Sequence, residues 1–246
     1  GKIRVLGSDA EAVLQYISAA DIAVSVGKIV YTQWLNDAGG IEADITITRI
    51  AENEFLVITP AATIRREMSW LTRHIPEQAH CYAIDVTSGE AVLAIMGPYA
   101  RDILQPVISQ SLTDGDFAFG TAQTVHIGMA EARAHRISYV GERGWELYVP
   151  AEMAEHVFDT VWQSGMSHDL RLTGLHVLDS CRIEKAFRHF GHDISDEDHI
   201  LEAGLGFAVK LDKTPSQIGN FIGRDAVLRK KDAGLSKRLI QFKLDD

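Results

Sequence analysis

A single carboxylate interrupts a strand-like pattern near the start of the chain, in the segment YTQWLNDAGGIEAD (31–44). Side chains alternate between the two faces of a strand, so Asp44 is predicted to lie on the polar face of residues 41–50. Asp is disfavoured in strands, and this one follows a Gly-Gly turn where a ligand could approach the backbone. A fixed carboxylate there could act as a general base. Periodicity alone favours the simpler interpretation, a solvated strand face.

A second pair of polar residues lies in the segment YVGERGWELYVP (139–150). We expect Tyr139 to end one strand and Glu146 to lie in the next, with a tight turn joining the two strands. A carboxylate at the edge of a pocket can accept two hydrogen bonds from a planar amino-amidine edge, such as that of a pterin or guanine ring. The alternative is a cross-strand pair on an exposed sheet, and the pattern by itself favours that alternative.

Three histidines and an acidic run raise the hypothesis of a metal site. The residues concerned are His189, His192, Asp193, Asp196, Glu197, Asp198 and His199. The first two histidines straddle Gly191, where a helix should already have ended, and acids at such places commonly cap turns and helices. We therefore predict no metal site, since tight sites need converging ligands that spacing alone does not show.

Other cofactor and catalytic motifs do not occur in the sequence. The GLG stretch at 204–206 lacks the third glycine and the βαβ unit of a dinucleotide fingerprint. There is no phosphate loop and no nucleophile elbow. Cys81 and Cys181 form no CxxC pair and no zinc spacing. Cys181 repeats with Leu175 and Leu178 at helical spacing, so we predict that it is a small buried residue.

Composition and charge narrow the class of protein. The chain has 246 residues, of which 46% are hydrophobic, enough to bury a sizeable core in one or two domains. A net charge of −10 argues against binding to nucleic acid or to a membrane surface, because phosphate polyanions need a basic field. The basic residues at 224–231 are better explained as a solvated helix face. No apolar run is long enough to cross a bilayer.

The elements that must position these residues follow from periodicity and turn signals. Helices are predicted over 8–17 with a capping box at Ser8, over 64–75, from Gly97-Pro98 onward, over 153–165, over 174–188 and over 224–234. Strands are predicted over 28–35, 41–50, 54–59, 82–86, 91–96, 122–127, 130–139, 144–149 and 205–211. Both ends, GKIRVLG and KRLIQFKLDD, also have strand-like patterns and look like cut ends of a longer protein. The fold class is α+β with mostly antiparallel sheets.

Five stretches in a fixed order resemble one family. They are GKIVYTQWLNDAGGIEADITITRI, DVTSGEAVLAIMGPYARDIL, SYVGERGWELYVP, DSCRIEKAFRHFGHDIS, and EAGLGFAVKLDK with FIGRDAV. Their order and spacing are similar to those of the folate-binding aminomethyltransferases, such as the T protein of the glycine cleavage system. The likeness is closest to the folate domain of dimethylglycine and sarcosine dehydrogenases and oxidases, and it covers nearly the whole chain.

The resemblance implies a fold in which α+β subdomains surround a central hole for tetrahydrofolate. Asp44 matches the family's catalytic aspartate. Tyr139 and Glu146 match residues that contact the pterin ring. Tyr31 and Asn36 lie in the family's Y-T-x-x-L-N element and are expected to line the site. The implied domains are a folate-binding domain of two intertwined α+β subdomains at 1–235 and the start of a truncated C-terminal barrel at 236–246.

Three departures from the family pattern affect the expected partners. No flavin domain precedes the region, so FAD is expected only on a partner domain or subunit. Leu178 stands where the glycine cleavage proteins carry an Arg, which favours the dehydrogenase branch and removes one expected partner of the folate tail. Arg143 and Leu201 replace residues expected to be aliphatic and Pro, as is common for drift at turns.

The implied activity is capture of a carbon from an N-methyl amine such as dimethylglycine or sarcosine. Tetrahydrofolate would take this iminium carbon and become 5,10-methylenetetrahydrofolate, with no metal required. One alternative is a demethylase that makes 5-methyltetrahydrofolate, and another is a folate-binding module without catalysis. The expected compartment is the cytoplasm, or the mitochondrial matrix in a eukaryote. The sequence does not identify the amine.

Overall fold

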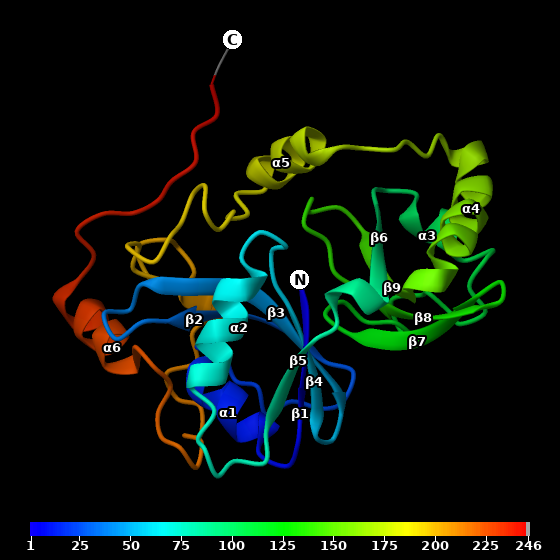
Figure 1. Cartoon of the computed structure of the whole chain (residues 1–246). Helices are drawn as coiled ribbons and strands as arrows, with labels where there is room; N and C mark the ends of the chain where they lie inside the picture. Colours follow the sequence, from blue (N-terminus) through cyan, green and yellow to red (C-terminus); the bar gives the residue numbers. More distant parts are fainter. Residues whose placement is uncertain (245–246) are drawn as a thin grey trace. The chain divides into compact units, whose positions relative to one another are not determined.

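A computed structural model describes residues 1–244 and contains two compact units, each with its own sheet and core. The first unit combines Gly1–Val86 with the chain from Arg188 onward, and the second is Thr87–Phe187. The second unit is therefore an insertion in the sequence of the first. Figure 1 shows the order of the elements along the chain.

The first unit is built on a five-stranded antiparallel sheet in the order β2-β3-β4-β1-β5. Its strands are β1 (Lys2–Leu6), β2 (Ile29–Leu35), β3 (Ile41–Ala51), β4 (Glu54–Ile58) and β5 (Tyr82–Asp85). Two helices, α1 (Ala10–Ile17) and α2 (Ile64–Arg73), contribute to one core with the apolar side chains of these strands (Figure 1). The alternation of β3 places Ala43, Ile45 and Ile47 in this core and leaves Asp44 on the opposite face.

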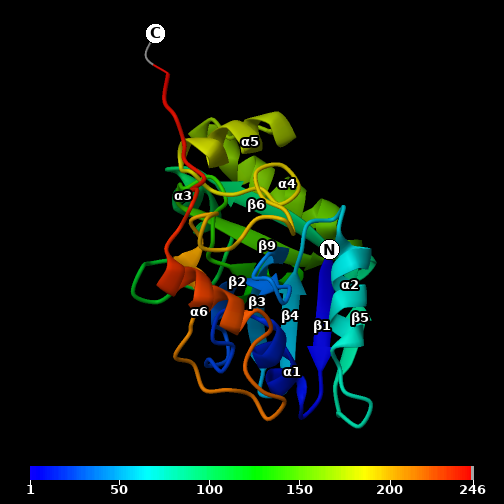
Figure 2. The same ribbon diagram turned by 90° about the vertical axis from the view of Figure 1, so that its left-hand side faces the viewer.

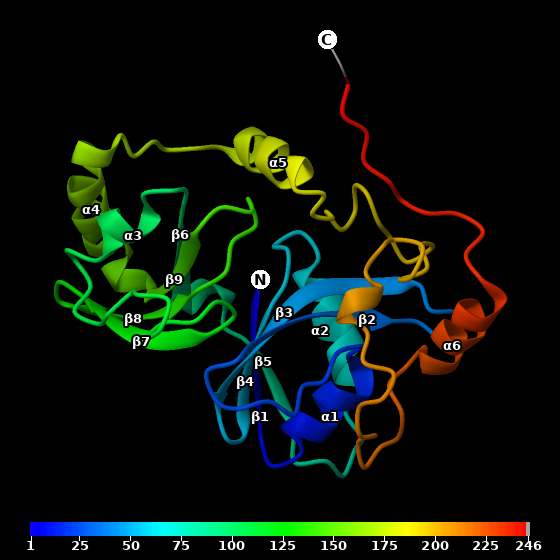
Figure 3. The same ribbon diagram turned by 180° about the vertical axis from the view of Figure 1, so that it is seen from behind.

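A smaller core closes the β2–β3 end of the first unit. It joins Leu35 and Ile41 to the chain after Arg188, including Val227 of α6 (Arg224–Ala233). Figures 2 and 3 show α6 and the 3-10 turn η4 (Gly206–Ala208) near β2. The segment that follows the second unit therefore returns to pack on the hairpin that carries Asp44.

The second unit has a four-stranded antiparallel sheet in the order β6-β9-β8-β7. The strands are β6 (Glu90–Met96), β7 (Ala122–Ile127), β8 (Ala130–His135) and β9 (Gly144–Pro150). The helices α3 (Ala100–Leu104) and α4 (Ala154–Gly165) pack on its apolar face around Trp145. The remaining elements are α5 (Leu175–Glu184) and the 3-10 turns η1 (Thr87–Gly89), η2 (Ala151–Met153) and η3 (Met166–His168).

The predicted α+β class with antiparallel sheets is confirmed, and three local predictions are wrong. Residues 205–211 form no strand, because Gly204 adopts a positive φ of 77° and η4 follows directly. β8 ends at His135 rather than at 139. Within 236–244, the described part of the strand-like end, no strand is present, and 245–246 lie outside the described residues.

Helix ends also differ from the expected positions. Asp9, not Ser8, is the N-cap of α1, and its carboxylate accepts a hydrogen bond from the backbone N–H of His80 at 2.7 Å instead of capping the helix. α3 begins at Ala100, after the Gly97-Pro98 turn. α5 ends at Glu184, before Ala186 at a φ of 57°. Cys181 is half-buried rather than buried.

No helix within residues 1–244 combines the length and the apolar character needed to cross a membrane.

Candidate functional site

The β2–β3 hairpin positions Asp44 opposite Gln33. The two residues are direct partners in the antiparallel register, so their side chains project from the same face of the sheet. The turn depends on Gly39, whose φ is 82°, and on Asn36, whose Oδ1 accepts the N–H groups of Ala38 at 3.0 Å and Gly40 at 2.9 Å. The side-chain oxygen of Asn36 is thus used within the turn.

Asp44 is partly buried and is held by neutral donors. Gln33 Nε2 donates to Asp44 Oδ1 at 2.8 Å, and the Tyr31 hydroxyl donates a second hydrogen bond. Burial raises the pKa of Asp44, whereas these two hydrogen bonds and the charge of His189 act to lower it. Among the described residues, no Lys or Arg forms an ion pair with Asp44. Burial has the larger effect, so the pKa of Asp44 is raised overall, and no Lys or Arg of the described chain neutralises the carboxylate.

Two side chains that contact Asp44 or its partner Tyr31 were not anticipated from the sequence. Gln33 is fully buried, and its Oε1 has no hydrogen-bond partner in the described part of the chain. Phe207, 72% exposed, stacks on the ring of Tyr31 with centroids 6.1 Å apart. Gln33 could have been found from the register that the Gly-Gly turn imposes. Phe207 could not, because it lies 176 positions after Tyr31 and in a segment expected to be a strand.

The histidine and aspartate run braces the hairpin. Asn36 Nδ2 donates to the backbone oxygen of Asp196 at 3.2 Å, and the N–H of Ile41 donates to the oxygen of Asp198. The carboxylates of Asp193 and Asp198 accept backbone N–H groups of their own turns. Within residues 1–244 no three His, Cys, Asp or Glu side chains come together in a group that could hold a metal. The carboxylates of Asp193 and Asp198 therefore cap turns, as expected from the sequence of this acidic run.

Glu146 is a partly buried carboxylate on a strand of the second unit, as Asp44 is in the first. It lies on β9 between Ala94 of β6 and His135 of β8, which are its partners in the sheet register. Tyr148, two residues along the same face, donates its hydroxyl to Glu146 Oε2 at 2.7 Å. Burial raises the pKa of Glu146, and the Tyr148 hydrogen bond opposes that rise. No described residue forms an ion pair with Glu146.

Tyr139 lies in the loop between β8 and β9, not at a strand end, because β8 stops four residues earlier. Its ring stacks on Phe187 with centroids 6.2 Å apart and an interplanar angle of 20°. Both rings are partly exposed. The second unit therefore combines a carboxylate on the sheet with an aromatic pair on a neighbouring loop and helix end.

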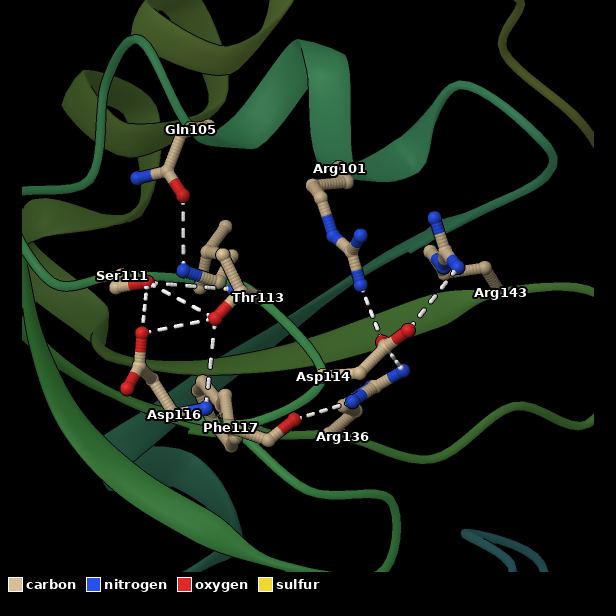
Figure 4. Close-up of polar contacts among 10 residues, drawn as sticks. Arg101, Gln105, Ser111, Thr113, Asp114, Asp116, Phe117, Arg136 and Arg143 are labelled. Carbon is tan, nitrogen blue, oxygen red and sulfur yellow. Dashed lines mark hydrogen bonds and ion pairs between the residues drawn. The ribbon is translucent and has the colours of Figure 1, made fainter.

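A group of arginines in the second unit is a structural cluster rather than part of the candidate site. Figure 4 shows Arg101, Arg136 and Arg143 around the carboxylate of Asp114. Arg136 also donates to the backbone oxygen of Phe117. The hydrogen bond and charge of Arg136, together with those of Arg101, lower the pKa of Asp114. Arg143, unexpected in the family pattern, thus helps to hold the loop that contains Asp114.

Comparison with known proteins identifies the family. The model of the GCVT N-terminal domain matches residues 1–213. The chain superposes on the glycine cleavage system aminomethyltransferase T of Bartonella henselae with a TM-score of 0.81, at 25% identity, covering 96% of this chain and 62% of that one. The chain belongs to the GCVT N-terminal domain family, and the resemblance to aminomethyltransferases is confirmed.

Two long relatives contain a region similar to the whole chain. The 4-methylaminobutanoate oxidase (formaldehyde-forming) of Paenarthrobacter nicotinovorans is 39% identical over 100% of this chain and 29% of its own length. Human mitochondrial sarcosine dehydrogenase is 34% identical over 100% of this chain and 28% of its own length. The chain thus spans less than a third of these relatives.

Proposed function

We propose that the chain is a tetrahydrofolate-dependent one-carbon transfer domain that captures the carbon of an oxidised N-methyl amine as 5,10-methylenetetrahydrofolate. The observation that carries the proposal is the environment of Asp44. It is a partly buried carboxylate, held by Gln33 and Tyr31, that forms no ion pair with a Lys or Arg among the described residues, and the charge of His189 favours its ionised form. Such a group stabilises a cationic reaction centre and accepts a proton from an attacking amine.

The second unit has side chains that suit a reduced pterin. Glu146 receives one hydrogen bond, from Tyr148 to Oε2, and nothing among the described residues donates to its Oε1. A pterin's amino-amidine edge offers two N–H donors that match a carboxylate. Tyr139 and Phe187 offer aromatic surface of the kind that a flat ring packs against. Bound tetrahydrofolate would supply the nucleophilic nitrogens N5 and N10.

The roles of the chain's own residues follow from their contacts. Asp44 acts as the proton acceptor and stabilises positive charge, for roughly 10²–10⁴-fold in rate. Gln33 and Tyr31 orient Asp44 and favour its ionised form. Asn36 holds the hairpin turn that positions this strand face. Glu146 binds the ring, with Tyr139 beside it.

The proposed carbon donor is a small N-methyl amine. The names of both long relatives denote N-methyl amino acids as substrates, 4-methylaminobutanoate and sarcosine. Oxidation of such an amine needs a hydride acceptor. The GLG stretch at 204–206 leads into η4 with no strand before it, so this stretch does not form a flavin-binding fingerprint. We therefore assign the flavin to a partner domain or subunit. The free cysteines Cys81 and Cys181 suit a reducing compartment.

A reconstituted reaction tests the proposal. A flavin-dependent sarcosine-oxidising partner would be assayed with sarcosine and tetrahydrofolate, with and without this chain. We expect the chain to lower formaldehyde release and to raise methylenetetrahydrofolate by the same amount. The chain alone should neither absorb near the flavin band nor oxidise sarcosine. Unchanged formaldehyde would contradict capture, and 5-methyltetrahydrofolate as the product would establish the demethylase alternative.

A further inference from the structure

A histidine without a hydrogen-bond partner lies on the polar face of the second unit's sheet. His135 is fully buried, and within the described residues neither ring nitrogen has a partner. Burial, followed by the charge of Arg133, lowers the pKa of His135 to about 3, so the imidazole is neutral at physiological pH. An unpaired buried polar ring costs free energy. Its position directly across from Glu146 in the register therefore requires an explanation.

The imidazole packs against the residue that holds Glu146. The rings of His135 and Tyr148 have centroids 4.3 Å apart at an angle of 39°. Tyr148 is 2% exposed, and its hydroxyl has Glu146 Oε2 as its acceptor at 2.7 Å. The tyrosine ring is thus confined by packing while its hydroxyl points along the sheet to the carboxylate.

None of the described charged groups on this face donates a hydrogen bond to Glu146, so its carboxylate is stabilised by Tyr148. From β8 the face carries Arg133 and His135, and from β6 it carries Glu90. Arg133 Nη1 lies 3.9 Å from Glu90 Oε1, so this cation is directed to a different carboxylate. His135 is neutral, and Tyr148 itself keeps its proton because burial and Glu146 both raise its pKa. The neutral hydroxyl is the one donor in the described chain that favours the ionised form of Glu146.

We infer that Tyr148 is a positioning residue for ring recognition. Its hydroxyl keeps the Glu146 carboxylate an acceptor and aims it at the amino-amidine edge of a ligand. His135 is the neutral ring that holds Tyr148 in place. This inference rests on the proposed function. A neutral donor suits the task, because a cationic partner would compete with the ligand's N–H groups for the same oxygens. The unpaired imidazole keeps Tyr148 packed without placing a second charge beside Glu146.

The test is the pH dependence of tetrahydrofolate binding, followed by calorimetry between pH 5 and 8. Protonation of Glu146 removes its charge and turns one of its two acceptor oxygens into a donor, so binding should weaken as the pH falls through the pKa of Glu146. Tyr148→Phe keeps the ring but removes the donor, which raises that pKa. The acid limb of binding should therefore move up by about one pH unit, the scale of one lost charge-assisted hydrogen bond. Tyr99→Phe, at a 57% exposed tyrosine of the same unit, is the matched control and should leave the limb in place.

His135 variants test the second half of the inference. His135→Ala should move the acid limb in the same direction as Tyr148→Phe, and His135→Phe, which restores ring packing, should bring it back toward the wild type. If wild-type protein does not bind tetrahydrofolate, the proposed function itself is wrong. If the wild type binds and Glu146→Gln weakens binding, but Tyr148→Phe leaves both affinity and acid limb unchanged, then only the role given to Tyr148 is wrong.

Discussion

At the scale of single residues, each unit presents a carboxylate supported by neutral donors. Asp44 receives hydrogen bonds from Gln33 and Tyr31, and Glu146 receives one from Tyr148. Burial raises the pKa of both acids. A cationic partner would lower these pKa values but would also neutralise the charge. The hydrogen bonds oppose the effect of burial and leave the carboxylates without a Lys or Arg partner in the described chain.

Glu146→Gln tests the ring contact. Gln replaces one acceptor oxygen with an N–H donor, which faces the N–H groups of the ligand. Hydrogen bonds to charged groups contribute about 1.5–3 kcal/mol, so tetrahydrofolate affinity should fall roughly tenfold or more in calorimetry. The melting temperature of the ligand-free protein should change little, because Gln keeps an acceptor for Tyr148. Unaltered affinity would show that Glu146 does not contact the ring.

Gln33→Leu tests the support of Asp44. Leu fills a similar volume but donates no hydrogen bond, so the pKa of Asp44 should rise further above the ordinary carboxyl range. A base works when it is deprotonated. The acid limb of the pH–rate profile for methylenetetrahydrofolate formation should therefore move to higher pH by about one unit, and the rate should recover above it. A limb that does not move would exclude Gln33 from the site.

At the scale of elements, the β2–β3 turn determines where Asp44 lies. A Cβ added at Gly40 would lie 2.0 Å from the backbone oxygen of Asp196 and 2.7 Å from Asn36 Nδ2. Gly40→Ala must therefore displace the loop at 196–200, which packs against the hairpin turn. We expect a loss of about 1–3 kcal/mol in the free energy of unfolding, measured by thermal melting, together with reduced transfer activity. Gly89→Ala, where nothing lies within 4 Å, is the control. Equal melting temperatures for the two variants would show that this loop is easily displaced.

The Asp114 cluster organises an element of the second unit by charge. Three arginines surround its carboxylate, and the contacts of Arg136 and Arg101 lower the pKa of Asp114 (Figure 4). A lowered pKa adds stability above the ordinary carboxyl range, and that stability is lost as the pH falls through the folded-state value. Asp114→Asn should therefore melt below wild type at pH 7, and the difference should fade in acid. Asp169→Asn, in an exposed pair with Arg171, should have little effect. A deficit independent of pH would contradict this electrostatic role.

Local sequence patterns predicted many helices and strands. They failed where residues distant in the sequence determine the structure or the burial of a segment. The alternation around Asp44 predicts β3 to within one residue of its observed end. The strand expected at 205–211 is absent because Gly204 turns the chain and no neighbouring strand pairs there. The polar face of β3 was predictable, but not its partial burial. The charge of His189, which comes 145 positions later in the sequence, also acts on the pKa of Asp44, and no local pattern predicts that effect.

At the scale of the whole molecule, the two carboxylates of the proposed function lie in different compact units. Asp44, the proposed proton acceptor, is in the first unit, and Glu146, the carboxylate proposed to bind the ring, is in the second. The relatives that oxidise amines are more than three times as long as the matched region. We therefore expect amine oxidation to take place on other domains or subunits, with this chain acting on the reactive carbon that they release.

The most direct test of the central claim is carbon transfer by the Asp44→Asn variant in the reaction reconstituted with a flavin-dependent sarcosine-oxidising partner. Asn is nearly isosteric with Asp but is not a base. We predict that tetrahydrofolate affinity stays within a few-fold of wild type, while the rate of methylenetetrahydrofolate formation falls by at least ~10²-fold and formaldehyde rises in its place. A variant that binds folate and transfers the carbon at the wild-type rate would contradict the account, because Asp44 would then be only a polar residue on a strand face.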